Sequence, residues 1–430
     1  MINKINKINK INKINKINKI NKRNKEALDY HSRFPAGKTK ISPSKNYRSQ
    51  RDLSLAYSPG VAEPCSAITQ FPQKAYDFTN KGNLVAVVSN GTAVLGIGNI
   101  GELASKPVME GKGLLFKVFA GVDVFDIEIA EKEPEIFIKV IRAIASTFGG
   151  INLEDIKAPE AFEIERRLKK ELKIPVMHDD QHGTAIISGA ALINSLEFVG
   201  KKIEKIKVVI NGAGSAAISC TRFYKKLGVK ANNILMFDRK GIICIERNDL
   251  TPEKKEFSVK THINLEEALK GADVFIGLSI AEILSTDMVL TMAKNPIIFS
   301  LANPNPEIRY ELAIKTRPDA IVASGRSDFP NQVNNVLGFP YIFRGALDVQ
   351  SITINEEMKL AAVFAIARLA KEKSFGKKSI IPHPLDSALI THVSLAVAKL
   401  AIKSGVARKK INDWNAYEEY LLDRRIIKVL

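Results

Sequence analysis

The chain has 430 residues, of which 45% are hydrophobic and 26% charged, a composition typical of a soluble globular protein with two or three domains. No apolar run approaches the roughly 18 residues of a membrane span, so we expect no membrane association. The three cysteines, Cys65, Cys220 and Cys244, are far apart, odd in number and without metal-ligand spacing. They indicate packing residues in a reducing, cytoplasmic environment.

The first 25 residues hold much of the net charge of +18. They are seven Ile-Asn-Lys triplets after Met1, followed by Arg23, Asn24 and Lys25, and they carry nine positive charges and no acid. A three-residue repeat matches neither the helical nor the strand period, so we expect residues 1–25 to be a disordered tail. Such a tail attracts polyanions weakly and predicts no specific nucleic acid. It also lacks the apolar region and the cleavage site of a secretory signal.

Residues 26–80 are rich in loops, with prolines at 35, 43, 59, 64 and 72. In the segment RDLSLAYSPGVAEPC, Tyr57 stands just before a Ser-Pro-Gly turn. Two interpretations of Tyr57 remain open: a buried, hydrogen-bonded core tyrosine, and a phenol that projects into a cleft as a proton donor.

The next elements predict a sheet followed by a glycine-rich loop. We expect strands at Asn83–Ser89 and Ala93–Ile97, joined by an Asn-Gly turn. Gly96, Gly98 and Gly101 form GIGNIG, but no long helix or ribose-binding acid follows. We therefore interpret this G-x-G-x-x-G match as a loop that lines a cleft, and not as the dinucleotide fingerprint.

Lys112 lies between two glycines in KPVMEGKG, which predicts a turn. Such a lysine is either a solvated surface charge or, if it is desolvated near a metal, a general base with a lowered pKa. We expect strands at Leu114–Phe119 and Val122–Ile129, and an amphipathic helix over Glu135–Phe148.

Residues 149–185 predict strand, helix, strand, with an acidic pair after each strand. Glu154 and Asp155 end the first strand, Asp179 and Asp180 end the apolar run Ile174–Met177, and Ala161–Leu172 forms the helix between them. Parallel strands place their carboxyl ends at one edge, where four carboxylates would repel one another unless raised pKa values or a cation relieved them. An all-oxygen site suits Mg²⁺ or Mn²⁺. The alternative is that these acids cap helices or face water. His178 and His182 lack the H-E-x-x-H placement of a zinc protease.

A second domain begins after Asp180 with a long apolar helix. The strand Lys207–Ile210 leads into G-x-G-x-x-A, formed by Gly212, Gly214, Ser215, Ala216 and Ala217, and a helix runs on to Leu227. Another strand, Ile234–Phe237, ends at Asp238. This context predicts a Rossmann-type site, with the pyrophosphate at the helix N-terminus and the acid on a ribose hydroxyl. Asp238 favours NAD, whereas Arg239 and Lys240 would accommodate the phosphate of NADP, so the choice stays open.

The Rossmann pattern continues towards the C-terminus, and three asparagines follow its strands. Asn303, Asn334 and Asn335 lie in turns, where amides hold a carboxylate or nicotinamide edge, or serve the turn backbone alone. The expected strands are Val274–Leu278, Ile297–Leu301 and Ile321–Ala323, and the expected helices are Asn355–Lys371, Ser387–Ser404 and an amphipathic segment at Ile411–Leu430.

Taken together, these strings closely resemble the bacterial malic enzymes of the branch often fused to a phosphate acetyltransferase-like domain. The resemblance runs from about Phe34 to Arg408. It rests on LAYSPGVAEPC, SNGTAVLGIGNIG, KPVMEGKG, FAGVDVFDIE, GGINLEDIKAP, HDDQHGTAI, GAGSAA, LANP and GRSDFPNQVNN.

The resemblance implies an α/β fold, in which an N-terminal substrate and metal domain precedes a doubly wound NAD(P)-binding domain with C-terminal helices. The implied division is a basic tail at 1–25, the two domains at 26–180 and 181–408, and a remnant linker at 409–430. The segment DWNAYEEYL resembles the linker into the acetyltransferase-like domain, which we expect to be absent here. A dimer or larger homo-oligomer is expected from the family.

The implied reaction is divalent-metal-dependent oxidation and decarboxylation of (S)-malate to pyruvate and CO₂ with NAD or NADP, extending to oxaloacetate. Mg²⁺ or Mn²⁺ would be bound by Glu154, Asp155 and Asp180. Lys112 would take the hydroxyl proton of malate, and Tyr57 would protonate C3. Asn303, Asn335 and Gly98 are the implied substrate residues, the two asparagines also meeting the cofactor. The alternative is a catalytically silent homologue retained for assembly.

Overall fold

The computed structural model describes residues 22, 24–94 and 96–424, so most of the predicted disordered tail, as well as 425–430, lies outside the described residues. Residue contacts divide the chain into two units, Met1–Asp52 and Leu53–Leu430. In the first unit, residues 24–32 are helical, and 33–49 form neither helix nor strand. Among the described helices, none combines the length and the apolar character that crossing a bilayer requires.

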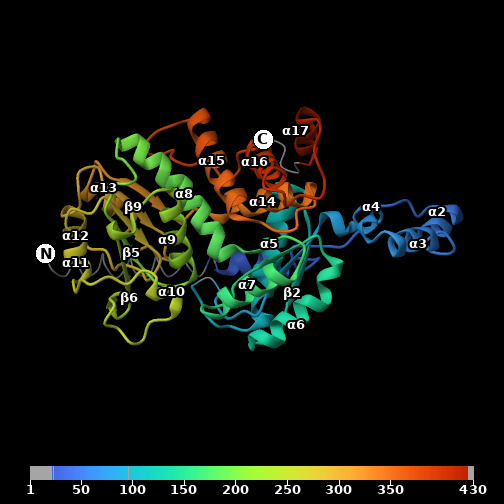
Figure 1. Ribbon diagram of the computed structural model, residues 1–430, viewed down its shortest axis with the longest axis horizontal. Helices are drawn as coiled ribbons and strands as arrows, with labels where there is room; N and C mark the ends of the chain where they lie inside the picture. Colours follow the sequence, from blue (N-terminus) through green and yellow to red (C-terminus); the bar gives the residue numbers. More distant parts are fainter. Residues whose placement is uncertain (1–21, 23, 95, 425–430) are drawn as a thin grey trace. The chain divides into compact units, whose positions relative to one another are not determined.

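The second unit begins with short helices and then forms a parallel four-stranded sheet in the order β2-β1-β3-β4 (Figure 1). Strands β1, β3 and β4 are buried along their length, whereas the edge strand β2 is half-buried and carries three acidic residues. Helices α6 and α7 enclose a separate core on one face of the sheet. The elements are α2 (Gln50–Ala56), α3 (Ala62–Gln70), η1 (Pro72–Lys74), α4 (Ala75–Phe78), η2 (Asn80–Asn83), β1 (Leu84–Ser89), α5 (Glu102–Ala120), β2 (Asp123–Glu128), α6 (Pro134–Ile144), η3 (Ala145–Thr147), β3 (Gly150–Leu153), α7 (Glu160–Glu171) and β4 (Val176–His178).

The predicted strand at Leu114–Phe119 is wrong, because this segment belongs to the 19-residue helix α5. Lys112 is therefore inside a helix and not in the predicted turn. Pro107 and the two glycines argue against a helix by local propensity, yet the helix forms because one face is buried. The ring of Phe116 packs 4.8 Å from that of Phe339 and 5.3 Å from that of Phe343.

The predicted strand at Ala93–Ile97 is also wrong. The segment forms a loop with one isolated bridge between Val94 and Gly98. Gly96 and Gly98 have φ angles of 68° and 89°, which are incompatible with an extended strand. The interpretation of GIGNIG as a loop is confirmed, but the expectation that no long helix follows it is wrong, because α5 begins directly after Gly101.

The second half of this unit is a six-stranded sheet in the order β10-β9-β8-β5-β6-β7, parallel except for β7. The reversal of strand order between β5 and β8 confirms the predicted doubly wound α/β arrangement. The elements are α8 (Asp179–Val199), β5 (Val208–Asn211), α9 (Ser215–Leu227), η4 (Ala231–Asn233), β6 (Ile234–Asp238), β7 (Gly241–Ile242), α10 (Pro252–Lys255), α11 (Leu265–Leu269), β8 (Val274–Gly277), α12 (Thr286–Leu290), β9 (Ile297–Ser300), α13 (Tyr310–Thr316) and β10 (Ile321–Ser324).

Among the C-terminal helices, α15 packs with α8 and α14 packs with α5. Their shared core joins the two halves of the unit. Helix α8, green in Figure 1, starts directly after β4 and runs beside α9 and α15. Most of its residues are buried, which explains its small and apolar sequence. The remaining elements are η5 (Asn335–Leu337), α14 (Phe339–Asp348), α15 (Glu356–Lys373), α16 (Leu389–Lys403) and α17 (Trp414–Asp423).

Candidate active site

Three of the predicted carboxylates meet at the carboxyl edge of the first sheet. Oxygens of Glu154, Asp155 and Asp180 lie within 4.8 Å of one another. The backbone N–H of Asp155 donates to Oδ2 of Asp180 over 2.8 Å, which ties the end of β3 to the first turn of α8. Asp155 has a φ of 53°, an uncommon conformation for a residue other than glycine and one that recurs at functional sites.

Lys112 reaches this cluster from α5. Its Nζ lies 2.8 Å from Oε1 of Glu154 and 2.7 Å from Oδ2 of Asp179. It also lies 4.3 Å from the ring centroid of Phe339, and the side chain is 11% exposed. Burial alone would lower the pKa of Lys112, but the nearby carboxylates raise it above its ordinary value. The expected lowering of this pKa is therefore not found in the protein without a cation, because negative charge surrounds the ammonium group.

In the described part of the chain, Lys112 is the ammonium group that contacts Glu154 and Asp179 of this cluster. Glu154 is buried, and Nδ2 of Asn152 donates to its Oε2 over 2.8 Å. Burial raises the pKa of Glu154 well above its usual range; Lys112 opposes this, and Asp180, Asp179 and Asp155 add to it. One ammonium group cannot balance four carboxylates, so the donor set fits a hard divalent cation bound through oxygen.

Asp179 connects the cluster to the C-terminal part of the chain. Nδ2 of Asn335 donates to Oδ2 of Asp179 over 3.2 Å, and the hydroxyl of Thr184 donates to Oδ1 of Asn335 over 3.1 Å. A Cβ on Gly183 would collide with Oδ1 of Asp179 and with the amide of Asn335. Only glycine therefore lets Asn335 approach this turn.

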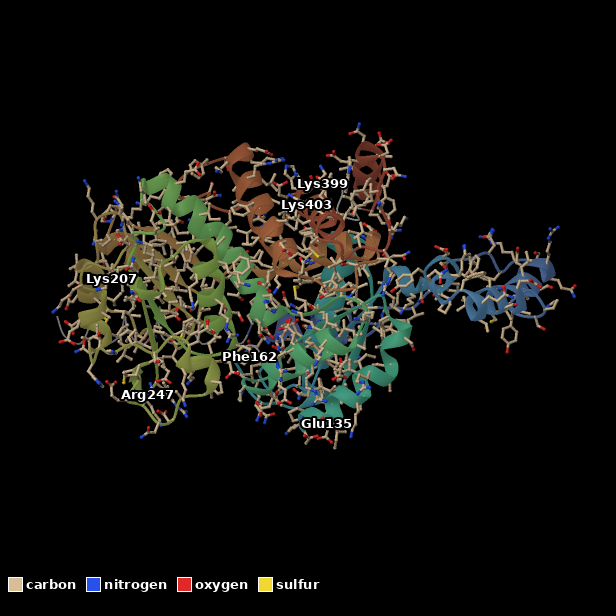
Figure 2. All side chains as sticks on the ribbon, in the orientation of Figure 1. Glu135, Phe162, Lys207, Arg247, Lys399 and Lys403 are labelled. Carbon is tan, nitrogen blue, oxygen red and sulfur yellow. The ribbon has the colours of Figure 1, made fainter. Side chains whose placement is uncertain are left out.

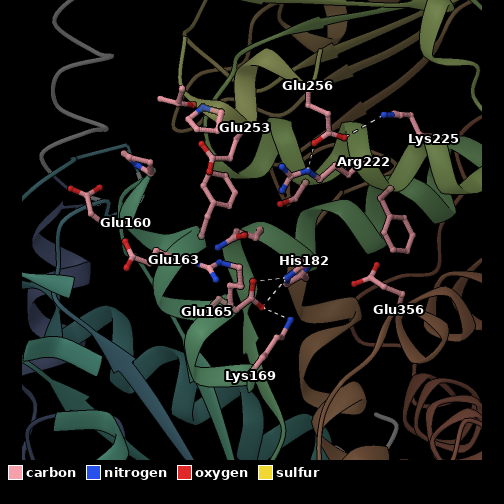
Figure 3. A pocket seen from close by; sticks show the side chains of 18 of the residues that line it. Glu160, Glu163, Glu165, Lys169, His182, Arg222, Lys225, Glu253, Glu256 and Glu356 are labelled. Atoms are coloured by element: carbon pink, nitrogen blue, oxygen red, sulfur yellow. Dashed lines mark hydrogen bonds and ion pairs between the residues drawn. The ribbon is translucent and has the colours of Figure 1, made fainter. Parts of the chain in front are cut away.

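A buried carboxylate supports the same turn from behind. Glu165 of α7 accepts from the backbone N–H of His178 over 3.1 Å and from Nε2 of His182 over 2.9 Å, so it contacts the residues on either side of the Asp-Asp pair. Nζ of Lys169 lies 2.7 Å from Oε1 of Glu165 (Figure 3). Burial would raise the pKa of Glu165, but His182, Lys169 and Lys359 hold this pKa well below its usual range.

His182 is uncharged at neutral pH, because burial lowers its pKa to about 4. Nζ of Lys359 lies 3.2 Å from Nδ1, so Nε2 carries the proton that Glu165 accepts. This network borders a cleft of about 1070 Å³ between α7, α9 and α10, shown in Figure 3. Gln181 and His182, which directly follow Asp179 and Asp180 in α8, are among the described residues that line this cleft.

Three predicted site residues are not gathered into the cluster. Tyr57 is 78% exposed, which excludes the interpretation as a core tyrosine in the single chain. Gly98 is exposed in its loop, and Asn303 is exposed after β9. The loop nevertheless meets the second sheet, because a Cβ on Gly96 would lie 2.7 Å from the carbonyl oxygen of Asn303.

The glycine motif occupies the position that its sequence context predicted. Gly212 follows β5 with a φ of 128°, Gly214 precedes the first residue of α9, and the two strands flanking the site are β5 and β8. A Cβ on Gly212 would collide with the carbonyl of Leu278. Ser215, Ala216 and Ala217 form the first turn of α9, where backbone N–H groups remain for a pyrophosphate.

Asp238 ends β6 as predicted, but cations already surround it. Arg247 contacts its two oxygens at 2.8 and 3.0 Å, and Nζ of Lys254 lies 2.8 Å from Oδ2. Although burial would raise the pKa of Asp238, these hydrogen bonds lower it to about 2. Arg239, which we predicted for the cofactor, is exposed beside it.

The sequence analysis missed Arg247, Lys254 and Glu165. Arg247 and Lys254 lie nine and sixteen residues after Asp238, beyond any local period, and they approach it only because β7 turns back along β6. Glu165 left a weak signal: it is the acidic residue on the buried face of an otherwise amphipathic helix.

The chain is similar to known proteins along most of its length. Residues 36–136 match the family described as "Malic enzyme, N-terminal domain", and residues 181–405 match "Malic enzyme, NAD binding domain". A protein of Haemophilus influenzae named NADP-dependent malic enzyme is 55% identical over 412 residues, 92% of this chain and 54% of that protein. One of Rhizobium meliloti named NAD-dependent malic enzyme is 54% identical over 413 residues, with the same coverage of 92% and 54%.

Among solved structures, the malic enzyme from Pyrococcus horikoshii is 45% identical, with a TM-score of 0.88, and the match covers 94% of this chain and 95% of that one. The chain thus spans about half the length of the two curated relatives and nearly all of the solved structure.

Proposed function

Because the chain belongs to the malic enzyme family, we propose that it oxidises and decarboxylates (S)-malate to pyruvate and CO₂ with reduction of NAD(P). The reaction depends on a divalent cation and extends to oxaloacetate. In this proposal, residues 26–180 bind substrate and metal and 181–408 bind the cofactor. The protein works in the cytoplasm. The observation that carries the proposal is the buried lysine held between Glu154 and Asp179, beside three convergent carboxylates.

Glu154, Asp155 and Asp180 would hold Mg²⁺ or Mn²⁺. Two observations support this assignment. The oxygens of the three carboxylates lie close enough to bind one ion. The pKa of Glu154 is raised by burial and by the neighbouring aspartates, so a cation would stabilise its ionised form. When bound, the cation supplies positive charge for the developing negative charge on substrate oxygens. Asp179 is kept from the metal by its contacts with Lys112 and Asn335, and it orients both side chains.

Lys112 takes the proton from the C2 hydroxyl of malate, and Tyr57 returns a proton to C3 after CO₂ has left. A nicotinamide cofactor held at the glycine motif of Gly212 and Gly214 would supply the hydride acceptor for C2. As a base, Lys112 must be neutral, and the carboxylates that raise its pKa include the proposed metal ligands Glu154 and Asp180. Binding of a divalent cation would offset their charge and make the lysine easier to deprotonate. Asn335 contacts Asp179, which also binds Lys112, and Asn303 meets the glycine loop at Gly96. In this proposal the two asparagines bind the substrate and the cofactor, and Gly98 of the same loop binds the substrate.

NADP is the proposed preferred cofactor. Asp238 would repel a 2′-phosphate if it were unpaired, but Arg247 and Lys254 bind both of its oxygens. Arg247 also pairs with Asp249 at 3.0 Å, so Arg247 and Lys254 balance the two aspartates in charge. The positive surplus around the ribose position comes from the exposed Arg239 and Lys240. A positive surplus favours the cofactor with the additional phosphate.

A dimer or larger assembly is part of the proposal. Helices α2, α3 and α4 contain no buried residue. The exposed large apolar side chains of this segment are Leu53, Leu55, Tyr57, Val61, Phe71 and Phe78. A contiguous segment of this kind marks an interaction surface. Covering it with a second copy would also shield Tyr57 from water, which a proton donor to a reactive enolate requires.

The test is an assay of purified protein with malate, Mn²⁺ and either NADP or NAD, following the absorbance of the reduced cofactor and the formation of pyruvate. We expect turnover that stops when a chelator removes the metal. Lys112→Ala should lower the rate by about 10²–10⁴-fold, as expected for loss of a general base. Lys117→Ala is the matched control, because Lys117 lies on the same helix but is exposed and paired with Asp123. Absence of turnover with both cofactors would favour the silent homologue, and an active Lys112→Ala would remove the proposed base.

A further inference from the structure

A second group of potential metal ligands lies at the far edge of the six-stranded sheet. Sγ of Cys244, a carboxylate oxygen of Glu246 and a ring nitrogen of His262 all lie within 4.8 Å of one another. Nε2 of His262 lies 3.2 Å from Oε2 of Glu246. None of these residues belongs to the proposed reaction, and the spacing of Cys244 in the sequence had indicated only a packing role.

The backbone holds these three residues together. Ile243 donates to Met236 over 2.8 Å and thereby extends the pairing of β6 with β7. Val259 donates to Ile243 and accepts from Ile245, both over 3.0 Å, so the segment before His262 lies along the segment that carries Cys244 and Glu246. The hydrogen bonds between these two segments thus bring Cys244, Glu246 and His262 close together.

The burial pattern suits a partly enclosed metal. Cys244 is 4% exposed and belongs to a buried apolar cluster, whereas the side chains of His262 and Glu246 are 64% and 51% exposed. The sulfur therefore lies at the core boundary, with the two other ligands on its solvent side. Because His262 and Glu246 are exposed, an ion can reach them from solvent, and water can supply the fourth ligand.

The donor atoms select the metal. A thiolate, an imidazole nitrogen and one carboxylate oxygen together suit Zn²⁺, whereas Mg²⁺ prefers oxygen alone. A deprotonated Cys244 and Glu246 with a neutral His262 would balance the charge of a divalent ion. We propose that Cys244, Glu246 and His262 form a zinc site, chemically distinct from the all-oxygen cluster, that fixes the turn 243–247 to the segment 259–262.

Cobalt substitution separates the two sites, because a thiolate bound to Co²⁺ gives a charge-transfer absorption in the near ultraviolet that oxygen ligands do not give. The full chain, stripped with a chelator and then saturated with Mg²⁺, is titrated with Co²⁺. We expect the intensity of this absorption to saturate at one Co²⁺ per chain, and the absorption to disappear when Zn²⁺ displaces the Co²⁺. Absence of the absorption would overturn the proposal and leave Glu246 and His262 as a surface ion pair.

Variants assign the ligands. Cys244→Ser should abolish the absorption, and the exposed changes His262→Ala and Glu246→Ala, which should not impair folding, should each weaken Co²⁺ binding at least tenfold, since loss of an outer-shell partner alone costs about 10–100-fold. Cys220→Ser and Cys65→Ser are matched controls and should titrate like the unchanged chain. An absorption that persists in Cys244→Ser, or unchanged binding in both His262→Ala and Glu246→Ala, would overturn the site. Malate turnover is not part of this measurement, so its outcome is separate from that of the proposed function.

Discussion

The carboxylates at the edge of the first sheet and the one at the edge of the second are in opposite electrostatic states. At the first edge, Lys112 forms ion pairs with Glu154 and Asp179, two of the four carboxylates there, and the pKa of Glu154 is raised. Asp238, in contrast, has Arg247 and Lys254 on its two oxygens, and its pKa is lowered to about 2. Both positions lie at the carboxyl ends of strands, so a strand end alone does not determine the charge of its surroundings.

This difference in charge indicates which kind of ligand each sheet edge binds. An acidic cluster with too little positive charge is stabilised by a cation, whereas the paired Asp238 leaves the exposed Arg239 and Lys240 beside it as a positive surplus for an anion. The first edge therefore suits a divalent metal and the second a phosphate. Figure 2 shows Arg247 on the loop beyond β6, where it serves the second of these roles.

The largest effect is expected from Asp180→Asn, which removes one of the proposed metal ligands. Malate oxidation should fall by about 10³-fold or more, because metal stabilisation of the transition state contributes several kcal/mol. The measurement is the steady-state rate over a Mn²⁺ titration. Asp319→Asn is the control, since Arg317 already pairs with Asp319 at 2.8 Å. Equal rates for the two variants would show that the first edge needs no cation.

Glu165→Ala should weaken metal activation without removing a ligand. The turn that carries Asp179 and Asp180 would lose its contacts at His178 and His182. We expect the Mn²⁺ concentration at half-maximal rate to rise by about 10–100-fold, and Glu165→Gln to recover part of the loss. Glu163→Ala, an exposed change on the same helix, should match the wild type. If Glu165→Ala needs no more Mn²⁺ than Glu163→Ala, Glu165 serves stability alone.

Lys254→Ala probes the positive surplus at the second edge. The KM for NADP should rise about tenfold with little change in kcat, because a charge-assisted hydrogen bond contributes about 1.5–3 kcal/mol. The KM for NAD should change less. Lys230→Ala is the control, because Lys230 is exposed before β6, at the opposite end of the strand. A larger effect on NAD than on NADP would contradict the comparison.

The smallest effect is expected at a third carboxylate pair, on β2. Asp126 and Glu128 share Lys106, at 2.5 and 3.6 Å, and burial together with Asp126 raises the pKa of Glu128 from 4.5 to about 7. The folded state binds this proton more tightly, so stability is lost as pH rises between these values. Glu128→Gln should remove about 1 kcal/mol of that loss and raise the melting temperature at pH 8 by ~2–4 °C. At pH 4 the two proteins should melt together, and a difference there would point to packing.

Sequence reasoning predicted the strands and the carboxylates at their ends because buried parallel strands are continuous apolar runs. It located Glu154, Asp155 and Asp180 on neighbouring strand ends, and the structure brings them together. It did not predict that Lys112 lies in a helix, because Pro107 and two glycines disfavour a helix by local propensity. The helix forms because residues such as Phe116 are buried in the core.

Long-range pairing accounts for the remaining omissions. The contacts of Asp238 with Arg247 and of Glu165 with His182 join residues that no helical or strand period relates. Cys65 was predicted to be a packing residue and is exposed, because α3 buries none of its residues in the single chain. Propensity describes each segment by itself, and these side chains are placed by other segments.

Helix α8 gives the two edges a mechanical connection. Its 21 residues form a rod of about 30 Å that begins with Asp179 and Asp180 and then runs beside α9, the helix that begins at the glycine motif. A stiff rod pivots as a whole, so a small rotation of the cofactor half would displace the two aspartates at its tip. In the proposed function, a ligand that rotated the cofactor half would thus act on the metal ligand Asp180, and any such coupling free energy would be the same in both directions.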